Sequence, residues 1–285
     1  MEQSAGGNFW VDEHFPVKKI DVGNRVFSYR QAGSQENKTP AIALLHGIGS
    51  GSGSWAHMLS YFEDHYRVLA WDAPGYNFST SLSGENPGAL GYARALDDFL
   101  SSLEVIPRII VGHSLGAMIA GAYAAEVNPS LPVLILADPA NGYGREPPKV
   151  RAEKLAYRLN MVRELGPDGM AEMRSKNLLS TFATTDALEL VKWNMRKVTS
   201  HGYEQASNTL VDGNLSGRAQ EYRGRVLVLC GGEDHVTPVE ACREVAKAYS
   251  DAPFTVLPGL GHASYVEGPE LFNTVVEDFL KTLEV

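Results

Sequence analysis

The sequence predicts an α/β protein with a mostly parallel central sheet flanked by helices and with a helical insertion. Short continuous apolar runs at residues 41–45, 67–71, 108–111 and 133–137 are typical of strands buried on both faces. These runs alternate with helical segments such as residues 90–103, and the alternation favours parallel pairing through right-handed crossovers. From residue 141 to about residue 220 the pattern becomes polar and helix-prone with no buried strand.

Further strands and helices are predicted at both ends of the chain. Residues 20–22 and 25–31 flank the dipeptide Gly23-Asn24, which suits the positive φ of a tight hairpin, so an antiparallel pair is expected at one sheet edge. The strand pattern resumes after residue 220. It predicts strands at residues 225–229 and 254–257 and helices at residues 239–249 and 269–283.

These patterns predict one core domain with an inserted cap. Residues 1–140 and 221–285 form the expected core, and residues 141–220 form the helical cap, with helices at 148–165 and 185–197. A chain of 285 residues with 44% hydrophobic composition is long enough for one large domain. The cap segment carries 12 Lys and Arg against 9 Asp and Glu, a net charge of +3 in a chain of −9, which leaves −12 for the remainder.

Composition excludes several other classes of protein. The acidic net charge argues against a general nucleic-acid binder, because phosphate contacts need a basic surface. No run approaches 18 apolar residues, and the first 15 residues have no basic start followed by an apolar core, so neither membrane insertion nor secretion is expected. Cys230 and Cys242 have no metal or redox spacing and are expected to be reduced. The sequence therefore predicts a cytoplasmic protein that binds neither nucleic acid nor membrane.

The strongest motif is IIVGHSLG at residues 109–116, which runs from an apolar strand into a small-residue helix. Ser114 stands between Gly112 and Gly116, the pattern of a nucleophile elbow. The turn is expected to be so tight that a side chain at either glycine would collide with backbone. It would lift the Ser114 hydroxyl out of the sheet edge.

A serine hydroxyl is a poor nucleophile near neutral pH, so chemistry at Ser114 needs a base and an acid that holds the base. Asp234 follows the strand at residues 225–229, and His262 follows the strand at residues 254–257. Loops that follow parallel strands emerge at the same sheet edge, so these three residues are expected to converge. Asp138 also follows a strand and is an alternative acid, although Asp234 is favoured.

Together these motifs resemble those of the α/β-hydrolase superfamily, whose triads follow the chain order Ser, Asp, His. The matching stretches run from His46 to Glu267. The resemblance implies that Ser114 is the nucleophile, Asp234 the acid of the Gly-x-x-Asp loop and His262 the base.

The resemblance also implies an oxyanion hole. The turn from His46 to Gly49 matches the oxyanion loop of the superfamily, which would place the backbone N–H of Ile48 beside that of Leu115. The residues expected to support this arrangement are His46, Gly47, Gly49, Gly112 and Gly116.

Other polar residues near these motifs are expected to have no chemical role. His113 is expected to lie behind the reacting groups, and Asp72 resembles an aspartate that organises loops in this superfamily. Four further histidines are expected to face solvent: His57, His65, His201 and His235.

The expected reaction is hydrolysis of a carboxylic ester of a small molecule through an acyl-enzyme, with no metal or organic cofactor. An alternative is C–C hydrolysis of a ring-fission diketo acid. The loop from Ile48 to Gly51, with Trp55 after it, is similar to that of the hydrolases that cleave such meta-cleavage products. Those enzymes typically carry Asn before the nucleophile and Trp after the histidine, where this chain has His113 and Ala263.

A non-catalytic small-ligand receptor on the same fold is the alternative from another class of protein, but such receptors often lose a triad residue. The positive charge of the cap further suggests that one cap arginine faces the site and recognises an acidic substrate, because burying an unpaired carboxylate is costly. The candidate arginines are Arg145, Arg151, Arg158, Arg163, Arg174 and Arg196.

Overall fold

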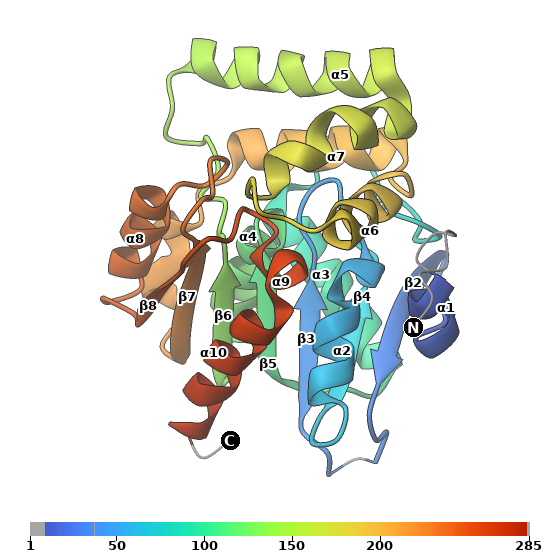
Figure 1. Ribbon diagram of the computed structural model, residues 1–285, viewed down its shortest axis with the longest axis vertical. Helices are drawn as coiled ribbons and strands as arrows, with labels where there is room; N and C mark the ends of the chain where they lie inside the picture. The colour runs from blue at the N-terminus through green and yellow to red at the C-terminus, as the bar shows by residue number, and fades with distance from the viewer. Residues whose placement is uncertain (1–8, 37, 284–285) are drawn as a thin grey trace.

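An eight-stranded sheet runs through the molecule in the order β1-β2-β4-β3-β5-β6-β7-β8 (Figure 1). The computed structural model describes residues 9–36 and 38–283, so residues 1–8 and 284–285 of the predicted core lie outside the described residues. β2 pairs antiparallel with β1 and β4, and every other pair is parallel. The strands are β1 (Lys18–Val22), β2 (Arg25–Ala32), β3 (Ala41–Leu45), β4 (Arg67–Trp71), β5 (Pro107–His113), β6 (Val133–Ala137), β7 (Arg225–Gly231) and β8 (Phe254–Leu257).

The predicted fold class is confirmed, and the strands follow the apolar runs closely. All five residues of β3 and all five of β6 are buried, because helices cover both faces of the parallel part of the sheet. β1 and β2 join through a turn in which Gly23 has a φ of 62°, as the hairpin prediction requires. β5 is longer than predicted, since it runs on to His113 at the elbow.

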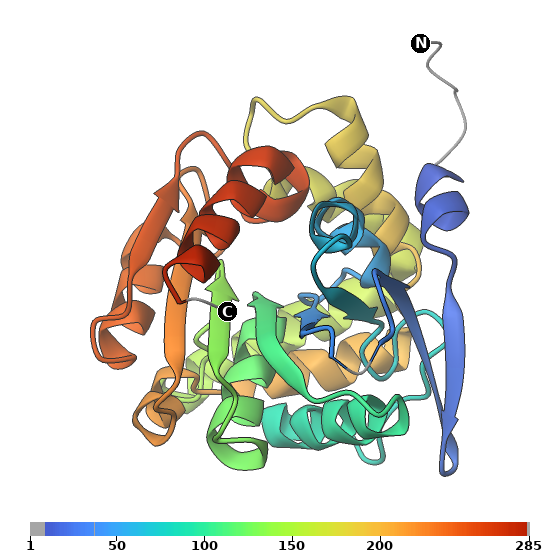
Figure 2. The same ribbon diagram turned by 90° about the horizontal axis from the view of Figure 1, so that it is seen from below.

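Helices cover both faces of the sheet (Figure 2). α2 and α10, drawn in blue and red, lie on one face, and α3 and α4, drawn in green, lie on the other. A π-helical turn, Tyr123–Val127, continues α4. The helices outside residues 141–220 that follow the hairpin are α2 (Ala56–Phe62), α3 (Gly88–Ser102), α4 (Leu115–Ala122), α8 (Val239–Ala248), α9 (Ser264–Glu267) and α10 (Pro269–Lys281).

Residues 141–220 are helical and gather at one end of the sheet, at the top of Figure 1. α5 (Pro148–Arg174) breaks at Gly166, whose φ of 61° is followed by Pro167, so its first part ends where the sequence predicted. α6 (Thr185–Met195) matches a predicted helix. α7 (Ser200–Asp212) was not predicted, because its buried face consists largely of small and polar residues that give no apolar periodicity.

A short N-terminal helix, α1 (Phe9–His14), was also not predicted. It is attached to β2 through the buried side chain of Arg30, which donates hydrogen bonds to the carbonyl oxygens of Val11 and Phe15 and to the carboxylate of Asp12. None of the helices in the described ranges is both long and apolar enough to cross a bilayer.

Candidate active site

Five polar residues follow the carboxyl ends of the parallel strands. His46 follows β3, Ser114 follows β5, Asp138 follows β6, Asp234 lies beyond β7 and His262 lies beyond β8. All five side chains are buried, with residue exposures of 5% or less. The parallel topology therefore brings polar groups that are far apart in sequence to one sheet edge beneath residues 141–220.

Ser114 occupies a strained turn between β5 and α4. Its φ of 51° and ψ of −113° are rare for a residue with a side chain. A Cβ at Gly112 would lie 2.4 Å from the carbonyl oxygen of Gly116, and a Cβ at Gly116 would lie 2.1 Å from that of Leu45. Only glycine fits at these two positions. Their backbones therefore pack closely enough to hold Ser114 in this conformation.

His262 and Asp234 form a buried pair. The Nδ1 of His262 lies 2.8 Å from Oδ2 of Asp234. The Oδ1 of Asp234 accepts hydrogen bonds from the backbone N–H groups of Val236 and Thr237, at 2.7 and 3.0 Å. Because Nδ1 donates to a carboxylate, Nε2 of the neutral imidazole is left as an acceptor.

Opposing effects act on the pKa of Asp234. Burial works to raise it, but the hydrogen bond and charge of His262 and the hydrogen bonds from Thr237 outweigh burial, so the pKa is lowered. Asp234 is therefore ionised near neutral pH and able to stabilise a positive charge on His262. Sequence analysis missed Thr237, whose hydroxyl donates to Oδ2 of Asp234 at 2.6 Å.

Ser114 and His262 line the same cavity. Within residues 9–36 and 38–283, the Ser114 hydroxyl makes no hydrogen bond to His262 or to any other group. Hydrogen bonds of this kind are often long or poorly aligned in the absence of substrate and tighten when it binds. The arrangement brings a hydroxyl and an imidazole together in the lining of one cavity.

The loop after β3 is held in place by His46. Its Nε2 accepts the backbone N–H of Ala73 at 2.9 Å, and its Nδ1 donates to the carbonyl oxygen of Gly47 at 2.9 Å. Burial lowers the pKa of His46, which keeps the ring neutral as both bonds require. Gly49 turns the loop with a φ of 78°. Ile48 lies between these glycines and lines the cavity.

Two backbone amides at this edge have no acceptor within the described residues. Leu115 is the first residue of α4, so its N–H has no acceptor inside the helix. The N–H of Ile48 also donates to no group in the described chain. Free amides beside a nucleophile are the groups that stabilise a developing oxyanion.

The cavity has a volume of about 190 Å³, below the 300–1,000 Å³ typical of sites for drug-sized ligands. Its apolar walls come from both parts of the chain: Ala140, Leu178, Val191, Leu210 and Val266. Val236, which is 45% exposed, marks where the cavity reaches solvent. The cavity fits a small, partly apolar molecule.

Comparison with known proteins places this site in a family. Residues 40–269 match the family described as alpha/beta hydrolase fold. The chain belongs to this alpha/beta hydrolase family. The match extends from just before β3 to the start of α10 and so includes every strand end that carries a polar residue of the site.

Two curated relatives are each 26% identical to this alpha/beta hydrolase. One is the 2-hydroxy-6-oxo-6-phenylhexa-2,4-dienoate hydrolase of Comamonas testosteroni, with 99% of each chain covered. The other is the putative carbamate hydrolase RutD of Escherichia coli O26:H11, with 86% of this chain and 92% of the relative covered. Both relatives are named as hydrolases, but the names give different substrates: a dienoate in one and a carbamate in the other.

Solved structures share the fold at lower identity. The enol-lactonase from Burkholderia xenovorans LB400 is 21% identical with a TM-score of 0.80, covering 93% of this chain and 100% of that chain. A thermophilic esterase from Thermogutta terrifontis is 20% identical with a TM-score of 0.82, covering 94% and 99%. At these identities the similarity shows the fold alone.

Asp138 is the alternative acid of this alpha/beta hydrolase, and within the described residues it makes no hydrogen bond with His262. Its carboxylate accepts the backbone N–H of Gly231 at 2.7 Å and the hydroxyl of Ser264 at 2.6 Å. Burial raises the pKa of Asp138 well above its usual range, and the charge of Asp234 raises it further. These contacts suit a structural group that connects β6, β7 and α9.

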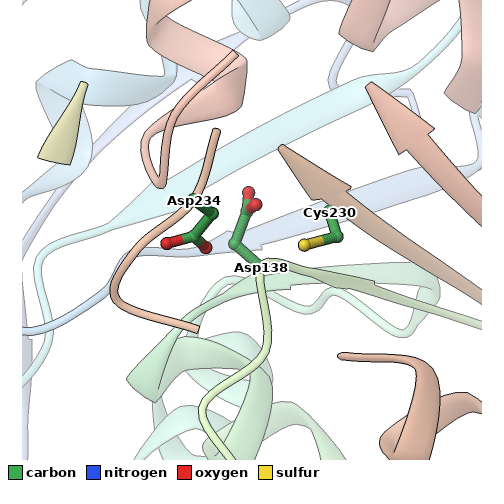
Figure 3. Close-up of side chains that lie close together, drawn as sticks. All are labelled: Asp138, Cys230 and Asp234. Carbon is green, nitrogen blue, oxygen red and sulfur yellow. The ribbon is translucent and has the colours of Figure 1, made fainter. Parts of the chain in front are cut away.

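Figure 3 shows Asp138, Asp234 and Cys230 grouped beside the end of β7, and their ligand atoms lie within 4.8 Å of one another. The donor set does not fit a metal ion. The oxygens of Asp138 and Asp234 already face hydrogens of Gly231, Thr237 and their neighbours, which a cation would have to displace. Cys230 is a buried free thiol near the carbonyl oxygens of Gly231 and Thr237.

His113 lines the cavity, and its ring centroid lies 4.7 Å from that of His262. Asp72 connects loops, because its carboxylate accepts hydrogen bonds from Ser28, Ser52 and Asn77. The prediction of a solvent-facing His57 is wrong. Its ring is half-buried, with its centroid 5.2 Å from that of Trp10, because the unpredicted helix α1 covers it. The other three histidines in that prediction are exposed: His65, His201 and His235.

Tyr265 is a cavity residue that sequence analysis missed. Its ring stacks on Trp55 with centroids 4.0 Å apart, and its hydroxyl donates to Ser54 at 3.0 Å. Burial raises the pKa of Tyr265 to about 12. Trp55, noted in the sequence for its place after the glycine-rich loop, therefore supports the cavity wall from behind. The only available signal was the position of Tyr265 three residues after His262.

Proposed function

We propose that this alpha/beta hydrolase cleaves a carboxylic ester of a small molecule through an acyl-enzyme, with Ser114, His262 and Asp234 as its catalytic residues. One observation carries the proposal: Ser114 at a strained elbow and His262, which is hydrogen-bonded to Asp234, line one small cavity. A non-catalytic receptor has no need for an ionised aspartate behind a histidine whose free nitrogen is an acceptor.

The reaction follows from these positions. Ser114 Oγ attacks the ester carbonyl while Nε2 of His262 takes its proton, and Asp234 stabilises the resulting imidazolium. The N–H groups of Ile48 and Leu115 stabilise the tetrahedral oxyanion, each contributing about 3 kcal/mol in comparable sites. His262 then protonates the leaving alkoxide. Water, deprotonated by His262, releases the acid and restores Ser114.

In this proposal residues 141–220 act as a cap that closes the cavity and sets its shape. Leu178, Val191 and Leu210 supply its apolar lining on that side. The reaction needs no metal or organic cofactor, because the nucleophile, the base and the oxyanion donors are all supplied by the chain.

Labelling with a fluorophosphonate tests the nucleophile directly. The probe should label wild-type protein at Ser114 in a 1:1 ratio, and the tryptic peptide that carries the label identifies the site. Ser114→Ala should lose both labelling and hydrolysis of 4-nitrophenyl acetate. Ser200→Ala, at an exposed serine of α7, is the control and should retain both. Labelling at another serine would overturn the assignment.

C–C hydrolysis of a ring-fission diketo acid is the second candidate. It is favoured by the relative named 2-hydroxy-6-oxo-6-phenylhexa-2,4-dienoate hydrolase, which matches this chain along nearly its whole length. Against it, His113 and Ala263 replace the residues that such enzymes typically carry. Turnover of that dienoate, followed by its visible absorbance, can be compared with turnover of 4-nitrophenyl acetate. A higher kcat/KM for the dienoate would reverse the order of the two candidates.

A further inference from the structure

The seven arginines of residues 141–220 divide into two groups by their partners. Four of them form ion pairs with carboxylates: Arg151 with Asp212, Arg163 with Glu204, Arg196 with Asp168 and Glu172, and Arg218 with Glu126. In the described part of the chain, Arg145, Arg158 and Arg174 have no carboxylate partner. Of these three, Arg145 is exposed, whereas Arg158 and Arg174 are half-buried and line the cavity of Ser114.

Neutral groups hold the guanidinium of Arg158 in place. It donates to the carbonyl oxygen of Lys154 at 3.1 Å and to the hydroxyl of Tyr143 at 3.3 Å, and it lies 5.3 Å from the centre of the Tyr143 ring. Its Nε is buried and has no hydrogen-bond partner among the residues that the structure describes. These contacts fix its orientation but supply no negative charge to balance its own.

Arg174 is held in a similar way from the other end of α5. It donates to the hydroxyl of the fully buried Tyr203 and lies 6.0 Å from the centre of that ring. Burial raises the pKa of Tyr203, so the phenol is neutral and leaves the charge of Arg174 unbalanced. Two oriented cations therefore share an apolar cavity with the nucleophile.

We infer that Arg158 and Arg174 form a binding subsite for a carboxylate of the substrate, so that the preferred substrates are small esters with a free carboxylate. This inference rests on the proposed function. A guanidinium matches a carboxylate in shape and charge, and the pairing is strong in a site that excludes water.

Charge and size define the substrate class further. The whole chain has a net charge of −9, so its overall field repels anions and a carboxylate must be recognised by local groups. Ser114 belongs to the sheet edge, whereas both arginines belong to α5, so the ester carbonyl and the carboxylate lie at opposite ends of the ligand. A cavity of about 190 Å³ fits half-esters of short dicarboxylic acids.

The test compares two esters of nearly equal size, one anionic and one neutral. Monomethyl succinate carries the carboxylate, and methyl 4-methylpentanoate replaces it with an isopropyl group. Wild-type protein should have the higher kcat/KM for monomethyl succinate, measured by proton release. The ratio of the two kcat/KM values should fall by roughly 10- to 100-fold in Arg158→Met and in Arg174→Met, since each variant removes one charged hydrogen-bonding partner.

Matched controls separate this role from a general effect of charge. Arg163→Met removes an arginine of the same helix that pairs with Glu204, and Arg145→Met removes the unpaired, exposed one. Both should keep the wild-type ratio. Arg158→Lys and Arg174→Lys should keep part of the preference that the methionine variants lose, and thermal melting should show that each variant is folded.

A binding measurement distinguishes failure of this inference from failure of the proposed function. Ser114→Ala should bind monomethyl succinate in a calorimetric titration, and adding Arg174→Met should weaken that binding at least about tenfold. If wild-type protein prefers the neutral ester and neither arginine changes the ratio, the carboxylate subsite is wrong while ester hydrolysis stands. If binding depends on Arg174 but Ser114 is neither labelled nor needed for turnover, the subsite stands and the proposed reaction is wrong.

Discussion

The ring of His113 packs against His262 and supports the loop that carries it. Nε2 of His113 donates to the backbone carbonyl oxygen of His262 at 2.9 Å, and the two ring centroids are 4.7 Å apart. Burial lowers the pKa of His113 well below 6.5, and the charge of His262 lowers it further. The residue before Ser114 is therefore a neutral histidine that positions the proposed base.

This neutral histidine makes stability depend on pH. A group whose pKa is lower in the folded state contributes its full stability above the unfolded pKa near 6.5, and loses it as the pH falls toward the folded value. Stability should thus fall from pH 6.5 to pH 5, with contributions from the buried His46 as well. His113→Gln should reduce the slope by up to about 1.4 kcal/mol per pH unit, measured by urea unfolding.

His201→Gln, at an exposed histidine of α7, is the control for the pH series and should keep the wild-type slope. Asp234 also has a lowered pKa, but its unfolded value of 3.8 places most of its effect at lower pH. An unchanged slope in His113→Gln would show that His113 is not neutral in the folded protein.

The two buried aspartates should respond differently to loss of charge. Asp234→Asn removes the acceptor that orients His262, and we expect kcat/KM for the ester to fall by about 10⁴-fold. In Asp138→Asn the amide oxygen can still accept the N–H of Gly231 and the NH₂ group can donate to Ser264, so the rate should change by less than about tenfold. The reverse ranking would make Asp138 the acid.

Because the backbone of Ser114 is strained, two inactive variants at this position should differ in stability. Its positive φ is unfavourable for any residue with a Cβ, so Ser114→Ala should keep the strain and Ser114→Gly should relieve it. Both variants should be inactive. The glycine variant should exceed the alanine variant by about 1 kcal/mol in the free energy of unfolding, measured by chemical denaturation. Equal stability would indicate that the turn is unstrained.

One of the contacts between residues 141–220 and the rest of the protein is made by two glycines, Gly202 and Gly75. A Cβ on Gly202 of α7 would lie 2.1 Å from the carbonyl oxygen of Gly75, and the same oxygen accepts the N–H of Thr199 at 3.3 Å. Gly202→Ala should therefore push the two backbones apart and cost about 1–3 kcal/mol of stability. Ser200→Ala, exposed in the same helix, should cost little, and thermal unfolding compares the two variants.

Much of this protein can be predicted from its sequence alone. Buried strands such as β3 and β6 appear as short apolar runs, because both of their faces are covered. Ser114 directly follows β5, and Asp234 and His262 lie in the loops beyond β7 and β8. A parallel sheet brings these loops to one edge. Local pattern and topology are sufficient there, because the strand ends themselves place the residues.

The tertiary structure decided what depends on side-chain direction and on distant partners. It placed His262 against Asp234 and left Asp138 bonded to Ser264, although both aspartates follow buried strands. It also directed Arg158 and Arg174 into the cavity and paired Arg163 with Glu204 outside it, although all three belong to α5. In the sequence, the three arginines are alike in charge, and so are the two aspartates. Which residue has a partner depends on the groups that other elements bring within hydrogen-bonding distance, and only the packed fold determines those groups.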